Sequence, residues 1–535
     1  MKSPSPELGS PALKDQAQAH AAIFELPPSS TDLIDTIPQS WSRLRRTITV
    51  VQLCGVNFTS SATNGLIVIG LPRLTADLNI PQSLAFWPLS VQGLSTASTL
   101  LVLGAVADVV GPRSLNLAGC IANGLLMLSC GFITTGQELI ILRALQGIMV
   151  ALHLSTSVAL VGKAHPSGRS RNVSFACLGV SQLIGFSFGL VVSGALMDTL
   201  GWCSGWYLYG GITLLLFPVG IWSLPRSTSL GGFRNTIINL RCKIDWLGAL
   251  LASAFMASLS YFFAAISIDV HHLTKPGNII LLCSSLVTLP LFFGWMHYQA
   301  KRSRPVLIPN AVWSNFAFTT GCINIALAFA VLNSLDLLTS LFFQKIQHLS
   351  AIEAATRILP SIAVGIILNV ITGHIVHIIP AVWLVTSASL LSSGSPLIMA
   401  LTQPMSSYWL GPFFAQLLLP FSIDVLFTVG LLIISEGFPE DRQSFAGALF
   451  NTAAQLGNAL GLAIVQVVSA AVTKRTAAPD STDAILEGYR ACFWFDFALM
   501  LICVMVGGFG MRRAGKIGLK HVNLISRSGG TILVV

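Results

Sequence analysis

Fourteen apolar stretches, each long enough to cross a bilayer, follow one another between about Ile48 and Phe509. A helix needs roughly 20 apolar residues to span the hydrocarbon core, and the short connections between these stretches leave no room for a soluble domain. The sequence therefore predicts an all-α polytopic protein that works inside a membrane. The predicted spans are 48–71, 84–106, 114–134, 138–161, 173–196, 205–224, 244–268, 277–298, 314–343, 355–379, 380–401, 409–435, 443–472 and 490–510.

Composition supports the membrane location. Of the 535 residues, 53% are hydrophobic and only 10% are charged, whereas soluble domains carry about 25% charged residues. Uninterrupted apolar runs such as Gly277–Trp295 also lack the one-faced pattern of a surface helix. A large soluble helical enzyme is therefore disfavoured.

The net charge of +9 is explained by topology rather than by nucleic acid. If the N-terminus is cytoplasmic, twenty Lys and Arg residues, not counting the distal Lys2 and Lys14, fall on the inner side of the membrane and seven on the outer side, while Arg143 falls inside a span. This asymmetry obeys the positive-inside rule. An even number of spans then places both termini in the cytoplasm. The lipid bilayer is a predicted partner and nucleic acid is not.

The chain divides into two helical bundles with extra segments. We expect a disordered cytoplasmic N-tail over 1–46, because Ser, Pro and Ala dominate it. The remaining predicted parts are an N-terminal six-helix bundle over 47–224, a cytoplasmic linker over 225–243, two inserted helices over 244–298, a C-terminal six-helix bundle over 299–510 and a cytoplasmic C-tail over 511–535. The ten cysteines show no metal-ligand spacing, so no metal or cofactor is predicted.

An internal repeat supports two related bundles. The fifth span carries Ser-Phe-Ala, then Gln-Leu, and a glycine pair at Gly185 and Gly189; the thirteenth span has the same elements with Gly457 and Gly461. A Gly-x-x-x-Gly pair alone only permits two helices to pack closely. The shared context indicates duplicated halves, which is how many secondary transporters are built.

The connection between the second and third spans carries the strongest motif. It reads Gly104-Ala-Val-Ala-Asp108-Val-Val-Gly111-Pro112-Arg113. Gly104 would let a helix approach its neighbour, Asp108 would cap a helix or pair with a basic group, and Gly111 would permit a tight turn. The segment resembles the signature loop of the major facilitator superfamily, Gly-x-x-x-Asp-x-x-Gly-Arg-Lys/Arg, with proline at the first basic position. The resemblance implies that this loop takes part in conformational switching.

Two further segments are similar to motifs of that superfamily. Arg143-Ala-Leu-Gln146-Gly147 is similar to the Arg-x-x-Gln-Gly motif of the fourth span. The glycines of the fifth span, Gly185, Gly189 and Gly194, are similar to the antiporter motif, although leucine and serine replace its proline and one of its glycines.

Fourteen spans, together with the stretch between Tyr408 and Gln455, resemble the fourteen-spanner drug:proton antiporter family, in particular its fungal aminotriazole-resistance type. The resemblance implies a fold of two six-helix halves plus two extra helices. It also implies export of organic compounds in exchange for protons.

Charged residues inside the spans are the candidate pathway residues, because an ionised group at mid-membrane normally faces a cavity or a partner. Arg143, with Gln146 of the same motif, is either a cavity cation that couples proton and substrate or a packing or snorkelling arginine. Asp424 is either a protonatable group or a carboxylate satisfied by Ser422 or by another helix. Asp336, nearer the outer end of its span, is a third candidate.

The predicted function is proton-coupled secondary transport by alternating access, with efflux of small organic compounds favoured. Two alternatives stay open: an importer of a small polar solute or ion, and a non-transporting sensor on the same scaffold. The sequence has no HExxH, GxSxG or Walker motif, so an enzyme is not predicted. We expect a monomer in the plasma membrane, with the vacuolar membrane as the alternative.

Overall fold

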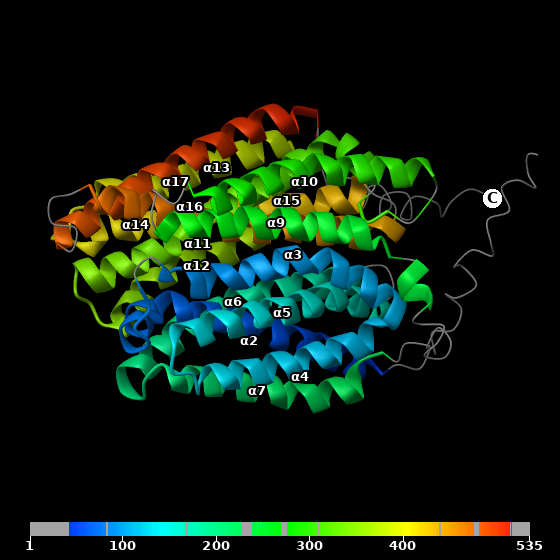
Figure 1. Ribbon diagram of the computed structural model, residues 1–535, viewed down its shortest axis with the longest axis horizontal. Helices are drawn as coiled ribbons and strands as arrows, with labels where there is room; N and C mark the ends of the chain where they lie inside the picture. The colour runs from blue at the N-terminus through cyan, green and yellow to red at the C-terminus, as the bar shows by residue number, and fades with distance from the viewer. Residues whose placement is uncertain are drawn as a thin grey trace, which may run out of the picture. The chain divides into compact units, whose positions relative to one another are not determined.

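Each predicted span coincides with one helix of the computed structural model or, in one case, with two (Figure 1). The structure describes residues 42–81, 84–165, 169–225, 238–242, 244–268, 275–302, 304, 306–308, 310–437, 440–475, 481–513 and 515. We call the first six long helices the N-half: α2 (Arg43–Asp77), α3 (Trp87–Val110), α4 (Pro112–Cys130), α5 (Gly136–Ala164), α6 (Arg169–Thr199) and α7 (Cys203–Ser223).

Two helices separate this half from the next: α9 (Trp246–Ile268) and α10 (Pro276–Lys301). We call the remaining helices the C-half: α11 (Phe316–Leu341), α12 (Ala351–Ile375), α13 (Ala381–Leu401), α14 (Pro412–Leu418), α15 (Pro420–Gly437), α16 (Glu440–Thr473) and α17 (Thr482–Gly510). Successive helices run in opposite directions, so their connections gather at two ends. The Gly111 end holds the α3–α4 turn, and the Gly201 end holds the α6–α7 turn.

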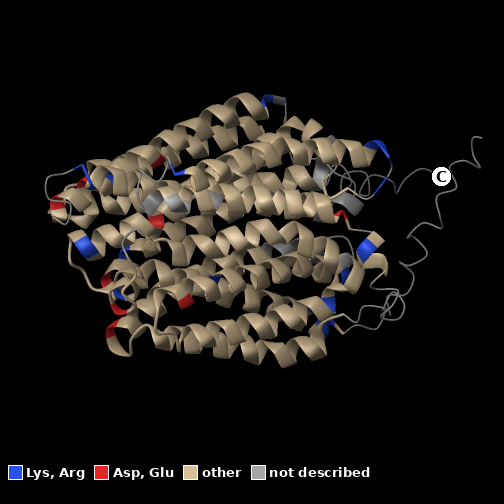
Figure 2. Cartoon of the chain, in the orientation of Figure 1, with Lys and Arg blue, Asp and Glu red and all other residues tan. Residues whose placement is uncertain are grey.

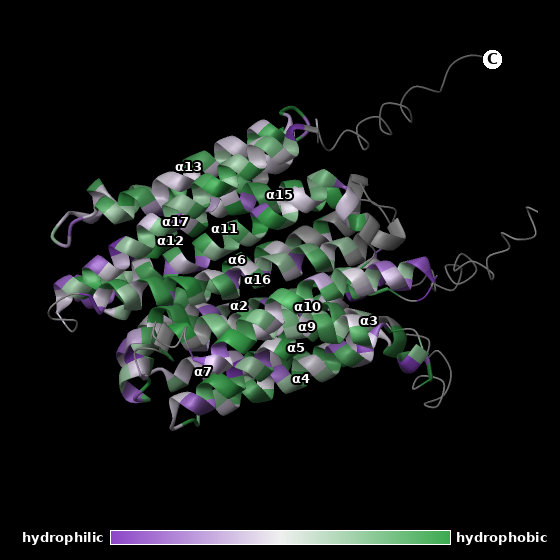
Figure 3. Ribbon diagram, turned by 45° about the horizontal axis from the view of Figure 1, so that its top comes forward, coloured by the Kyte–Doolittle hydropathy of each residue, from purple (hydrophilic) through white to green (hydrophobic). Residues whose placement is uncertain are grey.

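The charged residues follow this arrangement. In the part of the chain that the structure describes, Lys, Arg, Asp and Glu gather mainly at the two ends of the helices (Figure 2), and apolar residues cover most of the helix lengths between them (Figure 3). Such a distribution suits a lipid core flanked by two aqueous surfaces. The few charged side chains between the ends are therefore exceptional.

Twelve of the described helical segments are long and apolar enough to cross a membrane, with α14 and α15 contributing one of them together. The predicted count was fourteen, and the two helices that fall short are α2 and α4. In α2, polar residues such as Asn57 and Thr59 are buried. Asn57 Nδ2 donates to the Leu178 carbonyl of α6 at 2.9 Å, and Thr59 Oγ1 accepts from Thr213 of α7 at 2.8 Å. Polar residues of this kind lower the mean hydropathy of α2. The helix can carry them because they face the other helices of the bundle rather than lipid.

Three boundaries differ from the prediction for local reasons. The helix α2 begins at Arg43, inside the predicted tail 1–46. The helix α17 begins at Thr482 because the Ser481 hydroxyl caps it, accepting from Ala484 N at 3.2 Å. The predicted span 409–435 is divided between α14 and α15 at Pro420, which lacks the N–H that a continuous helix needs. Most of the N-tail, the linker 225–243 and the C-tail lies outside the described residues.

The inserted pair packs beside both halves. Ser253 of α9 donates to the Ser98 carbonyl of α3 at 2.8 Å, and α9 also contacts α16. Asp245, just before α9, accepts from Trp295 Nε1 of α10 at 2.9 Å. The hydrogen bond from Trp295 to Asp245 thus joins α9 to α10, and Ser253 joins α9 to α3.

The repeated glycines have the same packing role in each half. A Cβ on Gly185 or Gly189 of α6 would collide with backbone atoms of Phe58 or Ala62 in α2. In the C-half, a Cβ on Gly457 or Gly461 of α16 would collide with α11 at Ala326 or Ala330. Each half therefore uses glycines on one helix to admit its first helix at close range.

We expect Gly189→Ala to lower thermal stability, because the added methyl would meet the Ala62 backbone, which cannot move as a flexible side chain can. Overpacking of this kind costs about 1–3 kcal/mol. Thermal unfolding of the purified protein in lipid nanodiscs measures the effect. Gly211→Ala in α7 is the matched control, because no atom lies within 4 Å of its added Cβ. Equal stability of the two variants would contradict the close α2–α6 contact.

Candidate functional site

Apart from Lys163 in the last turn, Arg143 is the only arginine or lysine of α5, and its side chain is fully buried. Its Nε donates to the Pro88 carbonyl at 3.0 Å. Its Nη1 donates to Thr63 Oγ1 at 3.3 Å and to Gln146 Oε1 at 2.9 Å, and its Nη2 donates to Asn64 Oδ1 at 2.6 Å. The guanidinium thus joins α5 to α2 and to the first turn of α3.

The surroundings of this cation are neutral. The guanidinium carbon lies 5.8 Å from the centroid of the buried Trp206 ring, close enough for a cation–π contact. Gln146, bonded to Arg143, donates through Nε2 to Cys130 Sγ at 3.1 Å. Among the described residues no carboxylate contacts Arg143. The predicted Arg143 and Gln146 pair is therefore a fixed, buried positive charge held by amides, a hydroxyl and a carbonyl.

Asp424 is held between two helices of the C-half. Its side chain is 5% exposed, and its Oδ1 accepts from Asn369 Nδ2 of α12 at 2.8 Å. Thr428 donates to the oxygen of the same amide at 3.2 Å. A Cβ on Gly365 would lie 2.7 Å from Asp424 Oδ2, so the glycine leaves room for the carboxyl group. The partner is another helix rather than Ser422, whose hydroxyl lies 3.1 Å from that of Ser389.

Asp336 of α11 is also buried, with 5% of its surface exposed. Its Oδ1 has no hydrogen-bond partner within the described part of the chain. It shares α11 with Ser334, but the two residues lie on different faces of the helix. Asp336 and Asp424 therefore belong to the same half, and Arg143 belongs to the other.

Sequence reasoning missed a third buried carboxylate, Asp496 of α17. It has no exposed surface, its Oδ2 accepts from Ser334 Oγ at 2.7 Å, and its Oδ1 lacks a partner among the described residues. The signal was present, because Asp496 lies inside the predicted span 490–510. Among the side chains that the structure describes, the C-half thus buries the carboxyl groups of Asp336, Asp424 and Asp496, whereas the N-half buries the guanidinium of Arg143.

His153 of α5 was missed as well. Its Nε2 lies 3.2 Å from the Leu53 carbonyl, and its Nδ1 lies 3.1 Å from Asn116 Nδ2. Because a carbonyl only accepts, the proton is on Nε2, and Nδ1 accepts from the amide. This arrangement satisfies a neutral imidazole that joins α2, α4 and α5.

The predicted switch loop has mixed geometry. Gly111 has φ of 105°, a conformation that favours glycine, and this fits the predicted tight turn. A Cβ on Gly104 would meet only Ser155 at 3.7 Å, so no unusually close approach requires that glycine. Arg113 Nη2 donates to the Ile221 carbonyl at the end of α7. The side chain of Asp108 lies outside what the structure describes.

The two halves meet tightly toward the Gly201 end. Ser340, at the end of α11, and Gln344, in the turn that follows it, donate to consecutive carbonyls of α2, those of Val68 and Ile69, both at 2.9 Å. A Cβ on Gly194 of α6 would lie 3.1 Å from the Ile352 Cα of α12. Buried leucines of α2 and α11 join one hydrophobic cluster there. The Gly201 end is therefore closed between α2 and α11.

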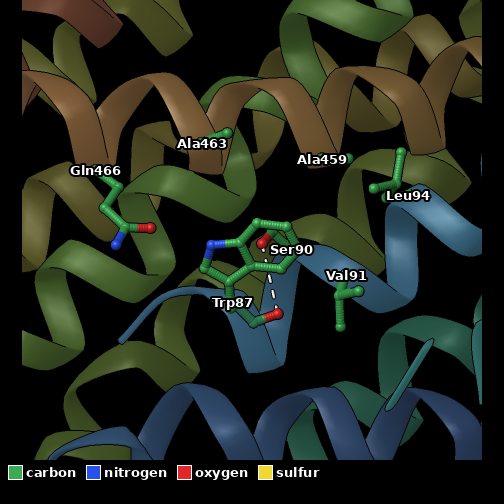
Figure 4. Close-up of a pocket in the computed structure, with 7 residues that line it drawn as sticks. All are labelled: Trp87, Ser90, Val91, Leu94, Ala459, Ala463 and Gln466. Carbon is green, nitrogen blue, oxygen red and sulfur yellow. Dashed lines mark hydrogen bonds between the residues drawn. The ribbon is translucent and has the colours of Figure 1, made fainter. Parts of the chain in front are cut away.

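A small void lies between α3 and α16. Figure 4 shows the indole of Trp87 between these helices, and the void's free volume is about 10 Å³. That is room for about one water molecule, so the void cannot hold an organic compound. Its lining residues are Trp87, Ser90, Val91, Leu94, Ala459, Ala463 and Gln466.

Comparison with known proteins agrees with this architecture. The pattern of the Major Facilitator Superfamily matches residues 53–462. "MFS-type transporter 1" of Pyricularia oryzae is 35% identical, with 90% of this chain and 86% of that protein covered. The aminotriazole resistance protein of Saccharomyces cerevisiae is 24% identical (79% and 76% covered), and the efflux pump terG of Aspergillus terreus is 25% identical (86% of each).

A solved structure shares the fold. The crystal structure of a bacterial homologue of the human lysosomal transporter Spinster, described as inward-facing and unoccupied, superposes with a TM-score of 0.61 at 14% identity, covering 88% of this chain and 98% of that one. At this identity the likeness concerns the fold alone. The matched pattern, the relative at 35% identity and the helical architecture together lead to one conclusion: the chain is a multi-pass membrane protein that belongs to the major facilitator superfamily.

Proposed function

We propose that this transporter exports small organic compounds in exchange for protons, by alternating access between the Gly111 and Gly201 ends. Relatives that are named as an efflux pump and a resistance protein support export. The observation that carries proton coupling is Asp424, a buried carboxyl held by the Asn369 amide. A carboxyl group at mid-membrane whose described partners are neutral is suited to gain and lose a proton.

The two halves provide the two parts of the proposed cycle. The N-half contributes the fixed charge of Arg143, and the C-half contributes carboxyl groups whose charge depends on a bound proton. With both termini in the cytoplasm, as the positive-inside rule favours, the closed Gly201 end faces outward and substrate enters from the Gly111 end. We place the protein, as a monomer, in the plasma membrane.

The substrate class follows from the same groups. The N-half buries one guanidinium whose described partners are neutral, so the fixed charges near the path are few. A compound that crosses by such a route must depend mainly on apolar and hydrogen-bonding contacts. We therefore propose uncharged or singly charged organic molecules of modest size as cargo.

Transport into inverted vesicles tests the proposal. Vesicles that contain the protein are given a panel of labelled compounds while the vesicle lumen is more acidic than the medium. The measurement is repeated after a protonophore has collapsed this pH gradient. We expect at least one compound to accumulate only while the gradient persists. Vesicles from cells that lack the protein are the control. Uptake that does not respond to the gradient would contradict proton coupling, and gradient-driven loss of compound from the vesicles would indicate import into the cell.

A further inference from the structure

We propose that Asp336 is a proton-binding switch: α11 closes against α2 at the Gly201 end only while the Asp336 carboxyl carries a proton. The proposal rests on the proposed function, because it gives the transported proton a specific place and a specific task. It differs from a general role in the pathway, since it links one carboxyl group to one contact between the halves.

The contact that closes this end is a polar latch, formed by Ser340 and Gln344 of the α11 region with the Val68 and Ile69 carbonyls of α2. Both donor–acceptor distances are 2.9 Å, and Gln344 Nε2 also lies 2.9 Å from Ser340 Oγ. Gln344 belongs to a π-helical turn, Phe342–Ile346, a rare geometry that often marks functional sites. The latch therefore depends on an exact placement of α11 against α2.

Asp336 lies one helical turn before Ser340, so the two side chains share the face of α11 that meets α2. The carboxyl group is buried, and its Oδ1 finds no donor among the described residues. An ionised carboxylate in such a place would leave Oδ1 without water and without a donor, which costs more than burial of a neutral carboxyl. The closed latch therefore favours a protonated Asp336 over a charged one.

The charged groups on the neighbouring elements have other described contacts or lie at other levels. Arg143 is bonded to Thr63 and Asn64 of α2, to Gln146 and to the Pro88 carbonyl. Asp496 of α17 is bonded to Ser334, on a different face of α11. The segment Ala446–Thr473 of α16 has no charged residue. Asp424 of α15 is bonded to Asn369, Glu353 of α12 to Ser350, and Arg357 of α12 to Gln347, while Lys345 lies in the π turn. On α17, Arg490 donates to the Thr402 carbonyl, and Asp483 and Glu487 lie near the start of the helix. At the far end of α2, Arg73 and Asp77 pair with each other.

The switch has a definite sign. The state closed at the Gly201 end binds a proton at Asp336 more tightly than the open state does, so acid favours closure and alkali favours opening. In the proposed antiport, a proton that enters from the Gly201 end closes that end behind it. When the proton leaves toward the Gly111 end, Asp336 becomes negatively charged again. The Gly201 end can then reopen while substrate is bound.

The test measures the distance across the Gly201 end without substrate or gradient. Nitroxide labels are attached to cysteines at Leu200 and Met405, which are 73% and 97% exposed and lie on loops of different halves, after the ten native cysteines are replaced by serine. Double electron–electron resonance in lipid nanodiscs is recorded at acid and alkaline pH. We expect a short distance in acid and a growing long-distance population in alkali. Asp336→Asn should abolish this shift and keep the distance short at both pH values.

Two further variants make the assignment specific. Asp496→Asn removes a carboxyl group of α17 that contacts the other face of α11 through Ser334, and it should leave the pH shift intact. The double variant Ser340→Ala, Gln344→Ala removes the latch donors and should increase the long-distance population at both pH values. The proposal would be overturned if the distance distribution of the wild type did not change with pH. It would also be overturned if Asp336→Asn still showed the pH-dependent shift in distance. Either result would leave proton-coupled export to be judged by the vesicle assay alone.

Discussion

Replacing Asp424 by asparagine is expected to abolish gradient-driven transport while the protein stays folded. Asparagine has nearly the same shape, and its Oδ1 can still accept from Asn369 Nδ2, as the carboxylate does at 2.8 Å. The amide, however, cannot exchange a proton at any physiological pH. Gradient-driven accumulation in inverted vesicles should therefore fall below about one tenth of the wild-type rate, as expected when an intramembrane proton carrier is lost.

Two comparisons separate loss of coupling from loss of structure. Thermal unfolding of Asp424→Asn should match that of the wild type, and exchange of labelled for unlabelled substrate across the membrane, which needs no net proton movement, should persist. Asp245→Asn is the matched control: its carboxyl group is equally buried but joins α9 to α10, outside both halves. Normal gradient-driven transport in Asp424→Asn would remove this residue from the proton path.

The helical architecture could be predicted because lipid imposes a simple rule, a long apolar segment for each crossing. The exceptions show what that rule omits. In α2, buried groups such as Asn57 and Thr59 lower hydropathy, and only tertiary contacts reveal that the other helices satisfy them. The division of span 409–435 was visible in Pro420, but the extension of α17 depends on the Ser481 cap, a local contact outside the apolar pattern.

The candidate site was predictable in its residue types and not in its partners. A charged residue within a span is evident from the sequence, so Arg143, Asp336 and Asp424 could be named. The sequence could not show that α12 supplies the amide that holds Asp424, because residues far apart in the chain meet only in the folded bundle. Asp496 carried the same signal inside its span, and its proximity to Ser334 required the three-dimensional arrangement of α11 and α17.

The alternatives for Arg143 illustrate the same limit. A snorkelling arginine would extend toward the membrane surface, but this side chain has no exposed surface. The side chain instead ends in four hydrogen bonds to α2, α3 and its own helix. The sequence left a cavity cation and a packing or snorkelling arginine as alternatives, and the geometry shows that the guanidinium fixes the positions of three elements.

Arg143→Lys is expected to impair both stability and transport, although it preserves the charge. The planar guanidinium directs donors to the Pro88 carbonyl, to Thr63 and Asn64, and to Gln146 at the same time. An ammonium group on a shorter, single-ended side chain cannot reach all of these acceptors. Each hydrogen bond to a charged group that is lost costs about 1.5–3 kcal/mol, and a loss of about 1.4 kcal/mol changes a population tenfold.

We therefore expect a lower unfolding temperature in nanodiscs and a strong loss of gradient-driven accumulation in vesicles for Arg143→Lys. Arg73→Lys is the matched control, since that arginine is half exposed and pairs with Asp77 at 3.8 Å on the surface of α2, where an ion pair is worth about 0–1 kcal/mol. Gln146→Ala removes one acceptor and should give an intermediate loss of stability. If Arg143→Lys behaved like Arg73→Lys, a positive charge alone would suffice at this position. The several hydrogen bonds of the guanidinium would then not be what holds α5 against α2 and α3.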